Sequence, residues 1–196
     1  MVSFNAQKLL HHRAVRVGGF LFYNHDGILS ELERSHIMDN ELFEIAQQLG
    51  RRLKSKEIKI ATAESCTGGW IAQTITEVSG SSAWFDRGFV TYSDAAKMEM
   101  LGVKPETLDK FGAVSVQTAT AMANGALAHS DADCTIAVTG IAGPDGGSAE
   151  KPVGTVFIAW AYKNRDVKVV QKELTGNRHQ IRRQKVKIAL EGVELG

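Results

Sequence analysis

The sequence predicts an α/β fold, a layered sandwich in which helices pack on a mixed sheet. Two short runs of apolar and β-branched residues, at 58–63 and 134–139, are each followed or preceded by a helical pattern. This alternation is typical of strands joined by crossover helices. Two further apolar runs, at 155–162 and 167–174, are separated by only four polar residues. That spacing predicts a hairpin, and therefore antiparallel pairing within the sheet.

The other elements follow from helical spacing, capping residues and helix breakers along the chain. Helices are expected at residues 70–78, 94–101, 104–111, 116–129 and 177–190, and a further strand at 89–92. Ser and Asp residues precede several of these helices, where their side chains cap free N–H groups. Neither an internal repeat nor a low-complexity segment interrupts this order.

The first 37 residues differ from the rest of the chain. They contain four of the six histidines and follow no clear period of 2 or 3.6. From Met38 on, leucine and isoleucine recur at helical spacing, which predicts a helix over about 40–55. We therefore expect a domain over 38–196. Residues 1–37 are expected to be a disordered tail, or an extension read from a start codon upstream of the true one.

Composition narrows the class of protein. The chain has 196 residues, 43% of them apolar, which suits one globular domain with an extension. A net charge of +1 favours neither nucleic acid nor an anionic membrane as partner, and no apolar run is long enough to predict a membrane span. Two cysteines, Cys66 and Cys134, are too few for a disulfide framework and favour a reducing, cytoplasmic location. His11 and His12 lack a second cluster at ligand spacing, so an exposed tail is favoured there and no metal site is predicted.

Two glycine-rich loops follow predicted strands, at residues 64–69 and 140–154. Ligands of open α/β sheets bind at the carboxyl ends of strands, and glycines let backbone N–H groups approach a ligand closely. A helix N-terminus, such as the one after the first loop, favours an anion. Neither loop has the spacing of a dinucleotide-binding or P-loop motif. Both could be ordinary connections, but the second is long for that purpose, so a binding site is favoured.

Ser65, in the first loop, is the candidate nucleophile. A serine needs a base, and Lys97 could supply one if burial or a neighbouring cation favours its neutral form. Tyr92 lies five residues earlier and could face the same edge of the sheet. Taken singly, each residue has a simpler interpretation: Ser65 as a helix cap, Lys97 as a solvated lysine and Tyr92 as a strand aromatic. Cys66 is a rival nucleophile, but a small buried thiol is the simpler interpretation there too.

Three arginines open the last predicted helix. Arg182 and Arg183 are expected on a solvated face. Arg178 lies nearest the helix N-terminus, where a bound phosphate would explain a cation. It is therefore kept as a candidate for binding the substrate.

Several motifs resemble, in order, those of the C-terminal domain of the competence/damage-inducible protein CinA family, which includes stand-alone nicotinamide-nucleotide amidases. The resemblance covers residues 38–196 nearly end to end. It rests on AESCTGGWIA (63–72), GSSAWFDRGFVTYSDAAK (80–97), LGV (101–103), GAVS (112–115), MANGAL (122–127), TGIAGPDGGSAEKPVGTVF (139–157) and the arginine-rich segment 176–184.

The resemblance implies a fold, an activity and a site. The fold would be a three-layer α/β/α sandwich with a mixed, mostly parallel sheet, commonly in a homo-oligomer. The activity would be hydrolysis of nicotinamide mononucleotide to nicotinate mononucleotide and ammonia, without metal or organic cofactor. The resemblance implies as catalytic residues Ser65, Lys97, Tyr92 and Thr139. The residues expected to bind the substrate are Cys66, Thr67, Gly68, Gly69, Gly140, Gly143, Asp145, Gly146, Gly147 and Arg178.

The chain departs from the family pattern beside the lysine. Where the family reads Tyr-Ser-Asn-Glu-Ala-Lys, this chain has Asp94 and Ala95 in the third and fourth places. Asp94 keeps a helix-capping side chain but adds charge, and Ala95 removes a group that could orient a neighbour. The alternative is therefore a diverged, non-catalytic paralogue that binds a nucleotide or a partner.

Overall fold

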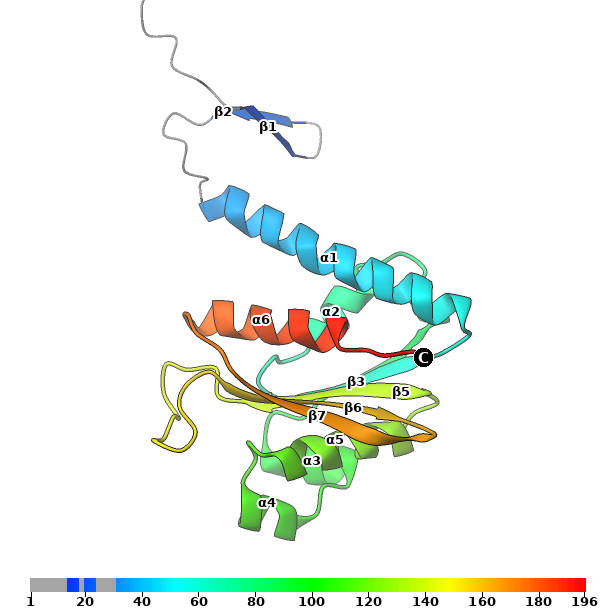
Figure 1. Ribbon diagram of the computed structural model, residues 1–196, viewed down its shortest axis with the longest axis vertical. Coiled ribbons are helices and arrows are strands. Elements are labelled where there is room, and N and C mark those ends of the chain that lie inside the picture. Colours follow the sequence, from blue (N-terminus) through cyan, green and yellow to red (C-terminus); the bar gives the residue numbers. More distant parts are fainter. Residues whose placement is uncertain (1–13, 18–19, 24–30) are drawn as a thin grey trace, which may run out of the picture. The chain divides into compact units, whose positions relative to one another are not determined.

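A five-stranded sheet lies between two layers of helices in the computed structural model, which describes residues 14–17, 20–23 and 31–196 (Figure 1). Contacts divide the chain into two units, Met1–Asn40 and Glu41–Gly196, and the sheet belongs to the second. The α/β class and the sandwich of helices on a sheet are confirmed.

The sheet has the strand order β4-β3-β5-β6-β7. β3 lies next to β4 and β5 and runs parallel to both, whereas β6 is antiparallel to β5 and to β7. The sheet is therefore mixed, as predicted, but parallel and antiparallel pairings are equal in number, so it is not mostly parallel. The strands are β3 (Ile60–Glu64), β4 (Phe85–Val90), β5 (Cys134–Gly140), β6 (Thr155–Tyr162) and β7 (Arg165–Glu173).

One helical layer contains α2 and α6 together with the part of α1 that belongs to the second unit, and the other contains α3, α4 and α5 (Figure 1). The sequence explains the two layers, because β3 directs Ile60 into one apolar cluster and Ala63 into the other. The helices are α1 (Glu31–Ser55), α2 (Trp70–Thr76), α3 (Asp94–Leu101), α4 (Pro105–Phe111), α5 (Val116–Ala128) and α6 (Arg178–Glu191).

Two boundaries differ by more than two residues from those predicted. The first long helix, expected from about residue 40, begins at Glu31. The strand expected at 89–92 is β4, which runs from Phe85 to Val90. It lies at the edge of the sheet and is half-exposed, so Asp86 and Arg87 are tolerated inside it, and these polar residues hid the strand from the apolar pattern.

Regular structure also occurs within the segment expected to be a tail. β1 (Ala14–Val17) and β2 (Phe20–Tyr23) pair antiparallel, and the first residues of α1 follow. These elements were not predicted. His11 and His12 lie outside the described residues, and the assignment of residues 1–37 to an extension of the domain stays a prediction.

Candidate active site

The serine loop, residues 65–69, leaves the carboxyl end of β3. The backbone N–H of Ser65 donates to the Val138 carbonyl at 3.0 Å, so the pairing of β3 with β5 continues to the candidate nucleophile. The N–H of Gly68 then donates to the Ser65 carbonyl at 3.0 Å and closes a turn. Gly68 and Gly69 have φ values of 64° and 92°, a left-handed conformation that favours glycine. Ser65 is thereby held, 9% exposed, at the entrance to α2.

Glu64 caps the helix that follows the loop. Its fully buried carboxylate accepts hydrogen bonds from the N–H groups of Ile71 at 3.0 Å and Ala72 at 2.8 Å. Such bonds satisfy donors that the first helical turn leaves free. This role of Glu64 was not predicted, and the helix N-terminus was expected to favour a ligand anion. That expectation is wrong for these two N–H groups, because an anion of the chain already occupies them.

Lys97 lies in the first turns of α3, after the capping side chain of Ser93. Its side chain is only 1% exposed, so the interpretation of Lys97 as a solvated lysine is wrong. Its Nζ donates to the carbonyls of Tyr92 at 3.5 Å and Ser93 at 3.4 Å. It also lies 3.4 Å from Oδ1 of Asp94, the charged departure from the family pattern. The candidate base is therefore held by two backbone carbonyls and lies beside a carboxylate.

Ser65 and Tyr92 leave the sheet side by side. The N–H of Thr91 donates to the carbonyl of Glu64 at 2.8 Å, and each candidate residue directly follows one member of this pair. Tyr92 is 63% exposed, and its hydroxyl accepts a hydrogen bond from Arg178 at 3.3 Å. The predicted common edge for the two residues is thus present in the structure.

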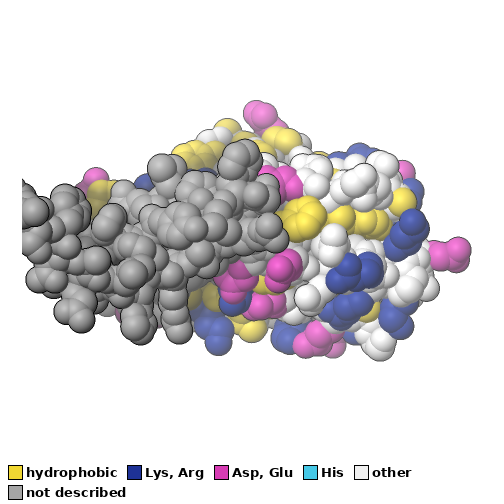
Figure 2. Space-filling view, turned by 90° about the horizontal axis from the view of Figure 1, so that it is seen from above, with side chains coloured by type: hydrophobic (Ala, Val, Ile, Leu, Met, Phe, Trp, Pro, Cys, Tyr) yellow, Lys and Arg dark blue, Asp and Glu magenta, His cyan; other side chains and the backbone are white. Residues whose placement is uncertain are grey.

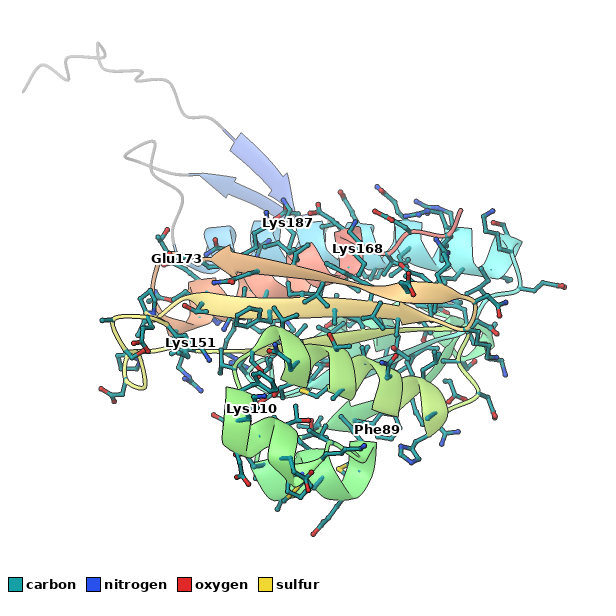
Figure 3. The ribbon with its side chains drawn as sticks, turned by 60° about the horizontal axis from the view of Figure 1, so that its bottom comes forward. Phe89, Lys110, Lys151, Lys168, Glu173 and Lys187 are labelled. Atoms are coloured by element: carbon teal, nitrogen blue, oxygen red, sulfur yellow. The ribbon has the colours of Figure 1, made fainter. Side chains whose placement is uncertain are left out.

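Arg178 also connects the second glycine-rich loop to this edge. Its other terminal nitrogen donates to the carbonyl of Gly143 at 2.6 Å. Lys151, which the sequence analysis did not single out, donates to the Phe111 carbonyl at 3.2 Å and ties the loop to the end of α4. Figure 3 shows Lys151 on the side of the sheet where α4 and Lys110 lie. Arg178 and Lys151 thus each tie the loop to another element, and Arg178 also contacts the candidate tyrosine.

Other members of the predicted site have different neighbours. Thr139 is buried on β5, and its hydroxyl donates to the Ala113 carbonyl at 2.7 Å, which joins β5 to the connection between α4 and α5. Asp145, Gly146 and Gly147 are exposed, and no hydrogen bond in the described part of the chain joins them to the serine loop. The structure thus groups Ser65 with the tyrosine and Arg178, but not with these three loop residues.

Two arginines expected on a solvated face of α6 are not solvated. Arg183 is 7% exposed and pairs with Glu41 at 2.5 Å. Arg182 is half-buried, and its guanidinium donates to the carbonyls of Cys66 at 3.1 Å and Thr67 at 2.6 Å. The expectation was wrong for Arg182 because α6 packs on the serine loop, a contact between segments more than 110 positions apart, and for Arg183 because it is buried and pairs with Glu41.

Cys66 faces α6 and not the candidate base. Its Sγ accepts a hydrogen bond from Nζ of the fully buried Lys185 at 3.4 Å. Burial raises the pKa of the Cys66 thiol, and the nearby lysine offsets only part of that rise. Burial also lowers the pKa of Lys185. A thiol whose thiolate is disfavoured is a poor nucleophile, which supports the interpretation of Cys66 as a buried structural residue.

Metal-binding clusters and membrane-spanning helices are absent from the described ranges, and large charged patches are absent from the face shown in Figure 2. Residues 14–17, 20–23 and 31–196 contain no cluster of three His, Cys, Asp or Glu side chains that could hold a metal ion. No helix in those ranges is long and apolar enough to cross a membrane. On the uncovered surface in Figure 2, positive and negative side chains are interspersed, so that face carries no large patch of one sign.

The model of the CinA C-terminal domain family matches residues 42–195. The chain belongs to this family. It is 50% identical over 153 residues to a protein of Escherichia coli K12 named nicotinamide-nucleotide amidohydrolase PncC, a match that covers 78% of this chain and 93% of the relative. A protein of the same name from Pseudomonas putida is 49% identical over 149 residues, 76% of this chain and 92% of the relative.

Solved structures of the CinA family have the same fold. The crystal structure of the competence/damage inducible protein CihA from Agrobacterium tumefaciens superimposes with a TM-score of 0.76 at 50% identity. The match covers 78% of this chain and 93% of that one. The family resemblance recognised in the sequence motifs, and the layered α/β fold that it implied, are therefore confirmed.

Proposed function

We propose that this chain is a nicotinamide-nucleotide amidase, which hydrolyses the carboxamide of nicotinamide mononucleotide to nicotinate mononucleotide and ammonia. The observation that carries the proposal is the 50% identity, over 93% of its length, to a relative named nicotinamide-nucleotide amidohydrolase. The geometry of the site gives independent support. Ser65 and Tyr92 leave the sheet side by side, and the buried Lys97 donates to the carbonyl of Tyr92. In the cell, the reaction would serve the recycling of pyridine nucleotides.

Ser65 is the nucleophile in this proposal. Its Oγ attacks the carboxamide carbon, while Lys97, in its neutral form, takes the hydroxyl proton directly or through the Tyr92 hydroxyl. The tetrahedral intermediate then expels ammonia, which leaves with a proton from the same pair. A water molecule attacks the acyl-serine and gives a proton to the lysine. The bond between the carbonyl carbon and Oγ then breaks, Ser65 takes that proton back, and nicotinate mononucleotide departs as its carboxylate with release of the remaining proton.

The serine loop stabilises the negative oxygen of the intermediate. Backbone N–H groups within residues 66–69 are the donors, apart from that of Gly68, which closes the turn to Ser65. They follow the nucleophile directly and approach the helix N-terminus. Loss of one such donor typically raises the barrier by about 3 kcal/mol. Cys66 and Thr67 thus contribute through their backbone, with Gly68 and Gly69 shaping the turn.

The second glycine-rich loop binds the ribose phosphate. Gly140, Gly143 and the exposed segment 145–147 supply close backbone approach, and Thr139 shapes the base of the loop. Arg178 adds a positive charge at the point where the loop meets Tyr92. A guanidinium suits a phosphate because its fork of donors matches the phosphate oxygens.

The chain is proposed to act without metal or organic cofactor, in the cytoplasm, on a small nucleotide and not on nucleic acid. The two free, buried cysteines suit a reducing compartment. A homo-oligomer is proposed from the family resemblance alone, and its test is the molar mass in solution.

The decisive experiment measures ammonia release from nicotinamide mononucleotide by the wild type, Ser65→Ala and Cys66→Ala. We expect turnover in the wild type, its loss in Ser65→Ala and its survival in Cys66→Ala. Survival in Ser65→Ala together with loss in Cys66→Ala would refute the assignment of the nucleophile. Binding of the nucleotide, detected by thermal shift, without turnover would instead favour the diverged, non-catalytic paralogue.

A substrate comparison tests the phosphate site. Nicotinamide riboside has the same carboxamide but lacks the 5′-phosphate, so the wild type should hydrolyse it with a much lower kcat/KM. Equal kcat/KM values for the two compounds would indicate an amidase for some other small amide.

A further inference from the structure

Three side chains on one face of α6 reach the segments that the proposed reaction uses. Arg178, Arg182 and Lys185 lie at positions i, i+4 and i+7, which share a helix face. Arg178 contacts the tyrosine and the second glycine-rich loop, as described above. Arg182 holds the carbonyls of Cys66 and Thr67, and Lys185 holds the Cys66 thiol. One helix therefore fixes both loops of the site.

The two bonds from Arg182 set the direction of a backbone donor. In a planar trans peptide the C=O and the N–H point in opposite directions. The Cys66 carbonyl and the Thr67 N–H share one peptide, and the carbonyl points at Arg182 on α6. The Thr67 N–H must therefore point away from α6. In the described part of the chain this N–H makes no hydrogen bond, so it is available to a ligand.

The Ser65 side chain faces the same way. Side chains alternate along an extended strand, and the pairing of β3 with β5 continues to the N–H of Ser65, so Ser65 faces the same side of the sheet as Ala63. Ala63, two residues before Ser65, packs in the cluster that contains residues of α3 and α5. The Ser65 hydroxyl and the Thr67 N–H thus both lie on the side away from α6, where the carbonyl oxygen of a substrate attacked by Ser65 would become negative.

We infer that Arg182 is a positioning residue, which aims the Thr67 N–H at this developing oxyanion. The inference rests on the proposed function. The forked guanidinium suits the task because it serves two acceptors at once in a fixed geometry, whereas a lysine offers a single point donor. The ring of Trp70, 5.3 Å from the guanidinium carbon, holds its plane.

The test compares Arg182→Ala and Arg182→Lys with the matched control Lys187→Ala. Lys187 is half-exposed on α6 and pairs with Glu41 and Glu191, so its removal takes one positive charge from the helix without touching the serine loop. We expect kcat to fall about 10- to 100-fold in Arg182→Ala, with KM changed less than about threefold, because a misdirected oxyanion donor acts in the transition state. Arg182→Lys should lie between Arg182→Ala and the wild type, and Lys187→Ala should match the wild type.

Two further measurements distinguish a positioning role of Arg182 from an effect on substrate binding or on the stability of the fold. In a Ser65→Ala background, which cannot turn over, adding Arg182→Ala should leave the Kd for nicotinamide mononucleotide unchanged. Amide hydrogen exchange over residues 65–70 should become faster in Arg182→Ala but not in Lys187→Ala. A kcat equal to that of the wild type, or a Kd that weakens as much as kcat falls, would overturn the inference.

The inference and the proposed function fail in different ways. If the wild type releases no ammonia from nicotinamide mononucleotide, the proposed function fails, and the exchange of residues 65–70 still decides whether Arg182 orders the loop. If the wild type is active and Arg182→Ala exchanges and turns over like the control, only the positioning role fails.

Discussion

α5 crosses α3 at a glycine, and a single methyl group there should disturb both the fold and the candidate base. A Cβ on Gly125 would lie 2.0 Å from the carbonyl oxygen of Leu101 and 2.8 Å from its carbonyl carbon. Both are backbone atoms, which cannot turn aside as a side chain can. Gly125→Ala must therefore push α3 away from α5, and α3 carries Lys97.

The magnitude follows from two opposed effects. Alanine gains about 1 kcal/mol of helix propensity over glycine. Forcing apart packed elements typically costs about 1–3 kcal/mol, and a clash with backbone belongs at the upper end of that range. The net destabilisation of Gly125→Ala should be about 2 kcal/mol, which for a domain of this size lowers Tm by about 4–8 °C. At 25 °C, well below Tm, kcat should also fall, because a displacement of α3 moves Lys97 relative to the serine loop.

Urea unfolding at 25 °C measures the free energy of unfolding, and thermal scans measure Tm. Asn124→Ala is the control, because Asn124 is the exposed neighbour on α5 and gains helix propensity without a clash. The control should equal or slightly exceed the wild type in stability. A Gly125→Ala protein as stable as Asn124→Ala would refute the reasoning, since the close approach of the two helices would then cost nothing.

Three predictions concern charge and protonation. Asp94→Asn removes the carboxylate that lies 3.4 Å from the Nζ of Lys97, an attraction of about 1 kcal/mol in water, so the free energy of unfolding measured in urea should fall by no more than about 1 kcal/mol, whereas Glu99→Gln on the exposed face of α3 should change nothing. Hydrogen bonds from Lys187 and then Arg183 lower the pKa of Glu41 below 4.5, so the stabilisation from Glu41 is present above that pH and is lost as the pH falls. Glu41→Gln should therefore reduce the loss of the free energy of unfolding at acid pH, by less than about 1 kcal/mol. Burial raises the pKa of Cys134 from 9.0 to about 12, so the thiol loses its proton at a lower pH in the unfolded chain than in the folded one. The free energy of unfolding should therefore fall as the pH rises from 9.0 towards 12, and Cys134→Ala should reduce that fall.

The helices and most strands could be predicted because their signals are local. Ser93, Ser115 and Asn177 each accept a bond from the first turn of the helix that they precede, and each stands next to an apolar-periodic segment in the sequence. β4 was misplaced by four residues at its start because an edge strand tolerates polar residues. The sequence pattern thus predicted an element where its buried residues recur with the period of a helix or a strand, and it misplaced the start of β4, which lies at the exposed edge of the sheet.

The candidate site was predictable only in part, for a different reason. Ser65, Tyr92 and Lys97 stand near strand ends, so topology alone brought them to one edge. The roles of Glu64 and Arg182 depend on backbone N–H and carbonyl groups, which every residue possesses and which no motif marks. A helical wheel of the last helix would have put Arg178, Arg182 and Lys185 on one face, but nothing in their spacing says that this face meets a loop and not water.

The contacts of α6 with both loops make it part of the candidate site, although it lies far from Ser65 along the chain. The serine loop turns on its own glycines, and Glu64 ends that turn by capping α2, so the local sequence determines the shape of the loop. The orientation of its peptides relative to the second glycine-rich loop depends on α6, because α6 donates hydrogen bonds to both. A chain that lacked α6 could keep Ser65 at the end of β3. It would lose Arg182, which fixes the peptide that carries the Thr67 N–H, and Arg178, which donates to the Tyr92 hydroxyl. We therefore expect catalysis to require the complete domain even though the nucleophile and the base lie in its first half.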